Sequence, residues 1–412
     1  MTSKNHRRCG HCNGVLPIAE RQCPYCGASL ENYGALGRLV DSILPEDAGV
    51  TKVLGGLAVG LYLVIGLAAG GTGILAQSIY TLIHFGAGFT PAVLDGEIWR
   101  VVTPIFLHGG VLHIGFNLYA LWLLGPVLER SFGRARYLIA FMLTGVLSTA
   151  AALGWKVIAP SVFSVIPFAD RIASASINTP MVGMSGSLCG LLGMGVTAGH
   201  RVGNEAGTAI RNRSLRWMGF LVVFGLIVPN VDNAAHLAGF VVGAAVGWIL
   251  PLKDRPGYVA GWFWAGGAAL CSLLIVGSVA AQLFSLPRHL PHDLDFYPTA
   301  IFGNSVRDGD REDNLVTDAE AACKRSLSAI DRGDTSRKMT AQAVANCDEV
   351  LHYVPFVPQL WALSAQAHLA NGDRATGCRR IGVAQAITRW DPNFQDAQYA
   401  QLLRSYRTEA CP

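Results

Sequence analysis

The sequence predicts an all-α protein that crosses a membrane several times, with a small cysteine-rich module before the membrane part and a soluble helical domain after it. Only 15% of its 412 residues are charged, whereas soluble domains carry about 25%. The middle of the chain is aliphatic and rich in glycine, and polar residues gather at both ends. This pattern is typical of tightly packed membrane helices that are flanked by soluble parts.

Changes in polarity divide the chain into a module over 1–35, a linker over 36–51, a membrane domain over 52–285 and a soluble domain over 286–412. The net charge of +4 is too small to indicate a nucleic-acid partner. The first apolar run begins near Val53, so we expect no cleavable signal peptide. The lipid bilayer is therefore the first partner that the composition predicts.

Seven segments are apolar enough to be membrane helices, which need about 20 residues each. They are 52–70, 111–128, 136–155, 182–199, 216–230, 234–251 and 260–284, of which the fifth is short. The segment 71–110 is too interrupted for a span, and we expect an interfacial loop there. Basic residues gather at 130–136, 201–216 and 253–255, which indicates a cytoplasmic N-terminus. An odd number of spans then places the C-terminal domain outside the cytoplasm, and we expect the inner (plasma) membrane of a bacterium.

Two polar motifs lie where predicted spans begin on the extracytoplasmic side. Ser185 stands in a Gly-x-Ser-Gly motif (183–186), and His236 shares a helical face with Gly239 and Gly243. Either motif alone is weak, because serine is common in membrane helices and a histidine beside glycines is often a packing residue. At a shared depth, however, the histidine supplies the base that a serine nucleophile needs. The pair predicts Ser185 as nucleophile and His236 as its base.

His108, His113 and Asn117 form a third polar cluster, near the outer end of the second predicted span. His113 and Asn117 are four residues apart and share a helical face. Their side chains are therefore candidates to stabilise the oxyanion of a tetrahedral intermediate. The alternative is a metal site, but two histidines and an asparagine without a carboxylate make a poor hydrolytic zinc site.

Together these motifs resemble those of the rhomboid family of intramembrane serine proteases over about half of the chain, Val53–Leu252. The positions that carry the resemblance are Trp99, Arg100, His113, Asn117, Gly125, Glu129, Gly183, Ser185, Gly186, Ala235, His236, Gly239 and Gly243. The resemblance implies a rhomboid-like six-helix core, to which the seventh span is an addition known from some members. It also implies a Ser185–His236 dyad without a third acid, and an oxyanion site made by His113, Asn117 and the Ser185 backbone N–H.

The resemblance also implies the partners of this chain, because the family's substrates are single-span membrane proteins that are cleaved in or beside a span that unwinds easily. No cofactor is implied for catalysis. One position departs from the family, which usually has an aromatic residue four after the nucleophile, stacked on the histidine; here it is Cys189. A non-proteolytic rhomboid-like protein that binds membrane helices is therefore the alternative function. A transporter with a cytoplasmic zinc sensor would need inverted repeats and broken helices, which we do not find.

The two polar ends carry cysteines in different patterns. Cys9, Cys12, Cys23 and Cys26 form two Cys-x-x-Cys pairs, which predict a zinc-ribbon-like module with one structural zinc ion. Redox chemistry is the alternative, but 1–35 is too short for the βαβ scaffold that it needs.

The tail is predicted as helices over 317–330, 339–352, 360–370 and 375–390, with a weak tetratricopeptide-like pattern and a binding or substrate-presenting role. Two disulfides of undetermined pairing are expected among its four cysteines, Cys323, Cys347, Cys378 and Cys411.

Overall fold

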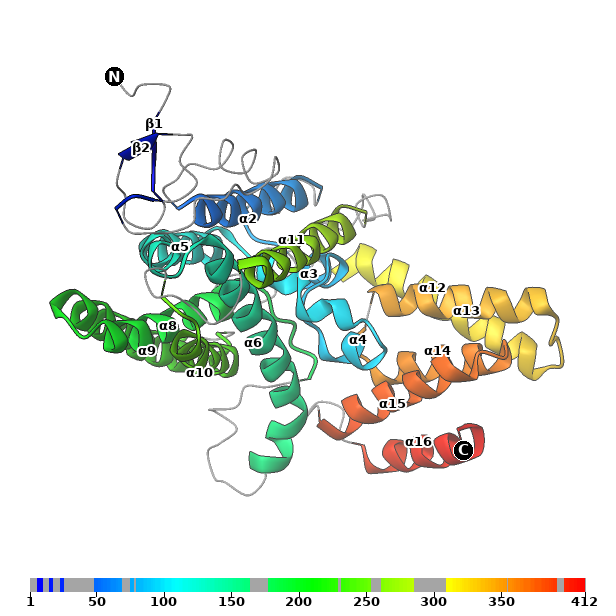
Figure 1. The fold of residues 1–412 in the computed structure, drawn as a ribbon. Coiled ribbons are helices and arrows are strands. Elements are labelled where there is room, and N and C mark those ends of the chain that lie inside the picture. Colours follow the sequence, from blue (N-terminus) through cyan, green and yellow to red (C-terminus); the bar gives the residue numbers. More distant parts are fainter. Residues whose placement is uncertain are drawn as a thin grey trace.

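The computed structural model describes residues 6–9, 15–17, 23–25, 48–68, 75–77, 79–163, 177–228, 231–252, 261–284, 309–353, 355–390 and 396–411. This part of the chain is almost wholly helical, and its helices form two packed groups (Figure 1). The larger group is the apolar one, and the smaller is the C-terminal tail, drawn in yellow to red.

In the described part of the chain, seven long helices build the apolar group, and each overlaps one predicted span. They are α2 (Gly49–Ala68), α5 (Val111–Phe132), α6 (Arg134–Phe163), α8 (Ser185–Val202), α9 (Glu205–Ile227), α10 (Asn233–Ile249) and α11 (Gly261–Phe284). Among the described residues, α2, α5, α6 and α11 are long and apolar enough to cross a membrane. The other three do not meet this criterion. Helix α8 is less apolar because it is rich in glycine, and α9 is less apolar because its first half is polar. Helix α10 is too short, with only 17 residues. These three pack against one another, and α8 and α10 also contact α6.

The structure differs from the prediction in two connecting segments. The expected loop over 71–110 holds two short α-helices, α3 (Ile79–His84) and α4 (Thr90–Leu94), and the 3-10 helices η2 (Ile98–Val101) and η3 (Thr103–Phe106). Helix α9 begins well before the predicted residue 216, so most of the basic 201–216 segment is helical rather than a loop. It begins there because the side chain of Asn204 caps it, accepting a hydrogen bond from the Gly207 N–H at 2.8 Å.

Arg100 is the polar centre of the segment with the short helices. Its side chain is buried, and its Nη1 donates to the carbonyl oxygens of Ile83 at 2.7 Å and Ala87 at 3.1 Å. Its Nε also pairs with the carboxylate of Glu97. A guanidinium has five donors in a fixed geometry, so one side chain holds the turn between α3 and α4 against η2.

Helices α8 and α10 touch through their backbones. A Cβ atom on Gly239 would collide with the carbonyl oxygen of Gly186, and one on Gly243 would collide with that of Gly190. Glycines at such positions allow two membrane helices to approach closely. The predicted glycine face of α10 is therefore the face that meets α8.

Glu129 joins α5 to the start of α2. Its buried carboxylate accepts hydrogen bonds from the N–H groups of Val50 and Thr51, both at 2.9 Å, and from the Thr51 hydroxyl at 2.7 Å. The first N–H groups of a helix have no partner within the helix. Glu129 thus caps α2 from a distant part of the sequence, and its negative charge suits a helix N-terminus.

The tail contains α12 (Gly309–Asp331), α13 (Arg337–Tyr353), α14 (Pro358–Ala370), α15 (Arg374–Trp390) and α16 (Ala397–Ala410). The first four correspond to the predicted helices, and α16 was not predicted. Disulfides join Cys323 to Cys347, between α12 and α13, and Cys378 to Cys411, between α15 and the end of α16. This is one of the three pairings that the sequence left open.

The tail lies against the short helices of the apolar group (Figure 1). The Phe356 ring packs edge-on against Phe89, with centroids 5.4 Å apart, and the Phe356 carbonyl accepts from Asn178 Nδ2 at 3.0 Å. Arg379 Nε donates to the carbonyl oxygen of Asp95 at 3.0 Å. The contact is thus both apolar and hydrogen-bonded, and it reaches the segment that precedes Ser185.

A chain of charges continues this contact into the tail. Arg380 lies 3.5 Å from the Asp95 carboxylate and also pairs with Asp348, which faces the His368 ring at 3.2 Å. Burial raises the pKa of Asp348, but hydrogen bonds from His368 and Arg380 outweigh it and lower that pKa to about 2. The stabilisation from ionised Asp348 is therefore lost only as the pH falls towards 2.

We expect Glu129→Ala to destabilise the apolar group of helices by at least about 2 kcal/mol, because it leaves one buried and one partly buried N–H group at the start of α2 without acceptors. Thermal unfolding of the purified protein in detergent measures the change. Glu205→Ala is the control, because Glu205 is exposed in the first turn of α9. Equal melting temperatures for the two variants would show that the cap contributes little.

Candidate active site

Ser185 is the first residue of α8, and the segment before it is held on two sides. Met181 and Gly88 exchange two backbone hydrogen bonds of 2.9 Å, and the Gly183 N–H donates to the Pro104 carbonyl at 2.8 Å. Gly183 has a φ of +112°, which favours glycine. This turn lets the chain enter α8 with Ser185 in its first turn, where backbone N–H groups have no helical partner.

His236 lies in the first turn of α10, and its Nε2 is 3.0 Å from the Ser185 hydroxyl oxygen. Asp232 caps the helix, because its carboxylate accepts from the Ala235 N–H at 3.0 Å. The Asp232 carbonyl accepts from the His236 N–H at 3.1 Å. The structure therefore brings the two predicted residues within hydrogen-bond distance, from helices that begin at the same end of the bundle.

His113 and Asn117 lie on α5 beside Gly183. The Gly109 N–H faces His113 Nδ1 at 3.4 Å, which leaves Nε2 to carry the ring proton. A Cβ atom on Gly183 would lie 2.6 Å from that Nε2 and 3.9 Å from the Asn117 amide nitrogen. Two side-chain donors thus border the turn that leads into Ser185.

His108 lies beside His113, but it is not one of the two donors that border the turn before Ser185. Its ring packs edge-on against His113, with centroids 5.2 Å apart. Burial, and then the nearby His113, lowers the pKa of His108 well below its usual value. A neutral His108 can lie beside His113 without charge repulsion, so it serves as a packing partner.

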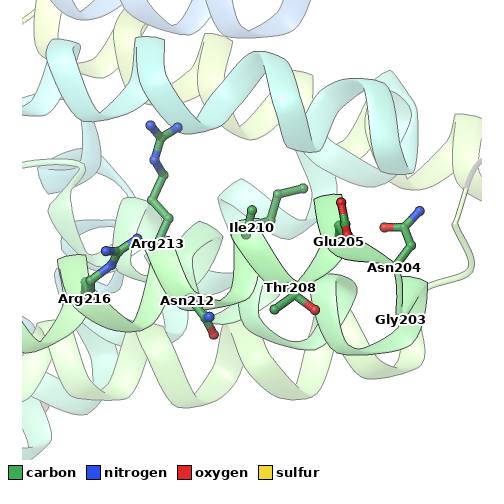
Figure 2. A pocket seen from close by; sticks show the side chains of 9 residues that line it. Gly203, Asn204, Glu205, Thr208, Ile210, Asn212, Arg213 and Arg216 are labelled. Carbon is green, nitrogen blue, oxygen red and sulfur yellow. The ribbon is translucent and has the colours of Figure 1, made fainter.

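A cavity of about 1190 Å³ contains the candidate site. Its walls include Ser185, His236, His113 and Asn117, together with apolar side chains of α5 and α9. A second hollow of about 730 Å³ lies along the first half of α9, and it shares with the first cavity Arg213 and Arg216, which Figure 2 shows. The residues that line it include no serine, cysteine or histidine. The first cavity is therefore the candidate active site.

Cys189 occupies the position where the rhomboid family usually has an aromatic residue. Cys189 is buried against Leu192 and Met218, and the second of these lies on α9. Among the described residues, no aromatic ring is paired with the His236 imidazole. The His236 Nδ1 also lacks a hydrogen-bond partner within the described chain. Neither a stacked ring nor a third acid orients the imidazole there.

The N-terminal module is described in part. Strands β1 (His6–Arg8) and β2 (Val15–Pro17) pair antiparallel, and Cys9 and Cys23 are buried with Leu16 in one small cluster. The first cysteines of the two Cys-x-x-Cys pairs are therefore brought together. Cys12 and Cys26 lie outside the described residues, and within these no group of three His, Cys, Asp or Glu side chains forms a metal site.

The sequence reasoning missed two residues of this region, Asp232 and Lys156. Asp232 could have been identified from the sequence, because an aspartate directly before an apolar helix commonly caps its first turn. Lys156 lies one residue beyond the predicted span 136–155, but in the structure it is buried on α6.

Comparison with known proteins places the similarity on this region. Residues 95–253 match the family model described as "Rhomboid domain". The chain is 30% identical over 221 residues to the "Rhomboid protease GluP" of Bacillus subtilis (strain 168), which is 51% of this chain but only 36% of that protein. It is 27% identical over 223 residues to the "Rhomboid-like protease 1" of Toxoplasma gondii, covering 52% of this chain and 68% of the relative.

A third relative is the "Putative rhomboid protease YdcA" of Bacillus subtilis (strain 168), which is 29% identical over 175 residues, 42% of this chain and 76% of the relative. The matches thus cover about half of this chain, and for GluP only about a third of the relative. The family match over residues 95–253 contains Ser185, His236, His113 and Asn117. Residues 95–253 are thus similar to a rhomboid domain, and the similarity to rhomboid proteases supports a relationship to the rhomboid family.

Proposed function

We propose that this chain is an intramembrane serine endopeptidase, with Ser185 as nucleophile and His236 as general base. One observation carries the proposal: the 3.0 Å contact between His236 Nε2 and the Ser185 hydroxyl, inside a cavity that also holds two further polar donors. A nucleophile within hydrogen-bond distance of a base is the arrangement that covalent hydrolysis needs. The family similarity adds support at the level of a protease.

In the proposed reaction, His236 Nε2 takes the hydroxyl proton as the Ser185 oxygen attacks a peptide carbonyl. The oxyanion that forms is stabilised by the Ser185 backbone N–H and by the side chains of His113 and Asn117. His236 then gives the proton to the leaving amine, which completes the acyl-enzyme. Water, activated by the same base, hydrolyses the ester and restores the hydroxyl.

The proposed substrates are transmembrane segments of single-span membrane proteins. The cavity wall between α5 and α9 carries aromatic side chains whose surfaces are exposed, which are Phe116, Tyr119 and Phe220. An apolar segment from the bilayer can lie against such a wall. It must unwind locally, because a helix holds its carbonyls in hydrogen bonds.

A non-proteolytic function is the second candidate, favoured by Cys189 alone. Without a stacked ring, the imidazole of His236 is less restrained. Such a protein would bind membrane helices in the same cavity. The short Ser185–His236 contact favours the protease.

We further propose that seven helices span the membrane, with the N-terminus in the cytoplasm of a bacterium and the tail outside. The tail contacts the segment that precedes Ser185, so tail and candidate site lie at the same end of the bundle. A structural zinc ion held by Cys9, Cys12, Cys23 and Cys26 completes the proposal. Zinc suits thiols kept reduced in the cytoplasm, and disulfides suit an oxidising exterior.

We expect Ser185→Ala and His236→Ala each to abolish cleavage of a single-span reporter protein, because nucleophile and base act as one unit. The measurement is product formation by purified protein in liposomes. Ser187→Ala is the control, because Ser187 is buried in the same turn. Turnover by His236→Ala near that of the wild type would refute the dyad.

Asn117→Ala should lower kcat by roughly 10²-fold, with a smaller effect on KM, because a donor to the oxyanion acts mainly in the transition state. Steady-state kinetics on the same reporter separate the two constants. A change confined to KM would instead indicate that Asn117 binds the substrate.

Full-length protein should contain about one zinc ion per chain, since four thiolates complete its tetrahedral shell. Replacement of the four N-terminal cysteines by serine should remove it, whereas Cys271→Ser should not. Elemental analysis after purification without added metal measures the content. Retention of zinc by the fourfold variant would place the metal elsewhere.

In intact cells, a membrane-impermeant thiol reagent should label the tail cysteines only after external reduction, because they are oxidised and outside. Mass spectrometry of labelled peptides identifies the cysteines. Labelling that requires cell lysis and no reductant would place the tail inside and contradict the proposed topology.

A further inference from the structure

Lys156 is a buried cation beside the candidate active site. It lies on α6, and only 3% of its surface is exposed. It lines the same cavity as Ser185 and His236. A buried ammonium group is costly unless hydrogen-bonded or paired, so its contacts define where the neighbouring segments must lie.

The first contact of Lys156 is to the segment that carries the nucleophile. Its Nζ donates to the carbonyl oxygen of Thr179 at 2.7 Å. Thr179 lies two residues before Met181, which is bonded on its other side to Gly88. This segment leads directly through the Gly183 turn to Ser185, so the ammonium group holds it from the α6 side.

The second contact of Lys156 is to the helix that carries the base. Its Nζ lies 3.6 Å from the carboxylate of Asp232. The other oxygen of that carboxylate caps α10 through the Ala235 N–H, one residue before His236. A single ammonium group therefore touches both segments that meet in the Ser185–His236 contact.

We infer that Lys156 is a positioning residue for the dyad: it ties the Thr179–Ser185 segment and the capped start of α10 to α6, and so sets the distance between Ser185 Oγ and His236 Nε2. This inference rests on the proposed function and deepens it. Lys156 takes no proton from the substrate and touches no reacting atom. Its effect is on geometry, where a displacement of about 1 Å can lower turnover about 10²-fold.

The test uses full-length protein in liposomes and two measurements. Steady-state cleavage of a single-span reporter gives kcat and KM. The second-order rate of labelling by a small fluorophosphonate reports the reactivity of Ser185 without the transmembrane substrate. Lys156→Met removes the charge and keeps the length of the side chain. Asp232→Asn removes the ion pair but keeps a residue that caps helices well.

We expect Lys156→Met and Asp232→Asn to lower both kcat and the labelling rate by about 10- to 100-fold, with KM changed less than about threefold. The double variant should lose little more than Lys156→Met, because both act through one contact. Lys156→Arg, which keeps the charge, should recover part of the labelling rate. Asp232→Asn decides the question if Lys156→Met fails to fold.

The matched control is Arg201→Met. Arg201 Nη1 donates to the carbonyls of Gly247 at 2.7 Å and Leu250 at 2.6 Å, at the other end of α10. Its loss should lower the melting temperature yet leave kcat near that of the wild type. An equal loss of kcat in Arg201→Met, or wild-type labelling of folded Lys156→Met and Asp232→Asn, would overturn the inference. Wild-type protein that neither labels nor cleaves would overturn the proposed function and the inference together.

Discussion

The direct backbone contact between α8 and α10 is the constraint on which the candidate site depends. Helices that carry side chains at their contact lie about 8–10 Å apart. Here Gly239 meets the Gly186 carbonyl with no room for a Cβ atom. The first turns of the two helices are therefore brought close enough for a serine side chain to reach an imidazole. A methyl group at this contact would push the two helices apart. It would therefore separate the serine side chain from the imidazole without touching either of them.

Polar side chains within the apolar domain act mainly on the main chain. Glu129 supplies acceptors to the start of α2, and Arg100 supplies donors to the turn after α3. Lys156 does the same for the Thr179 carbonyl. In a medium of low dielectric constant, leaving a polar group of this kind unpaired costs free energy. Each of these side chains is therefore favourable only where it meets its main-chain partners. The few charges in this sequence thus select the positions of the short segments that helix packing alone leaves undetermined.

The sequence predicted the parts of the site that follow from local periodicity. The spacing of His113 and Asn117, and of His236 and Gly239, fixes shared helical faces whatever the tertiary structure. The link from Glu129 to Val50 could not be read in this way, because it joins residues distant in the sequence. The same holds for the pairing of Cys323 with Cys347 and for the contact of Arg380 with Asp95. The early start of α9 was readable in principle, since Asn204 followed by Glu205 is a helix-start signal.

A serine–histidine pair without a third acid has to orient its imidazole by other means. In a triad, the acid holds the ring through Nδ1, but in the described chain His236 Nδ1 has no such partner. Asp232 is close in sequence, yet its carboxylate binds the Ala235 N–H rather than the ring. The acid thus orients the helix, and the helix orients the ring. The position of the imidazole is thereby set by the placement of α10 rather than by one hydrogen bond, and this placement depends on the glycine contact with α8 at one face and on Asp232 at its first turn.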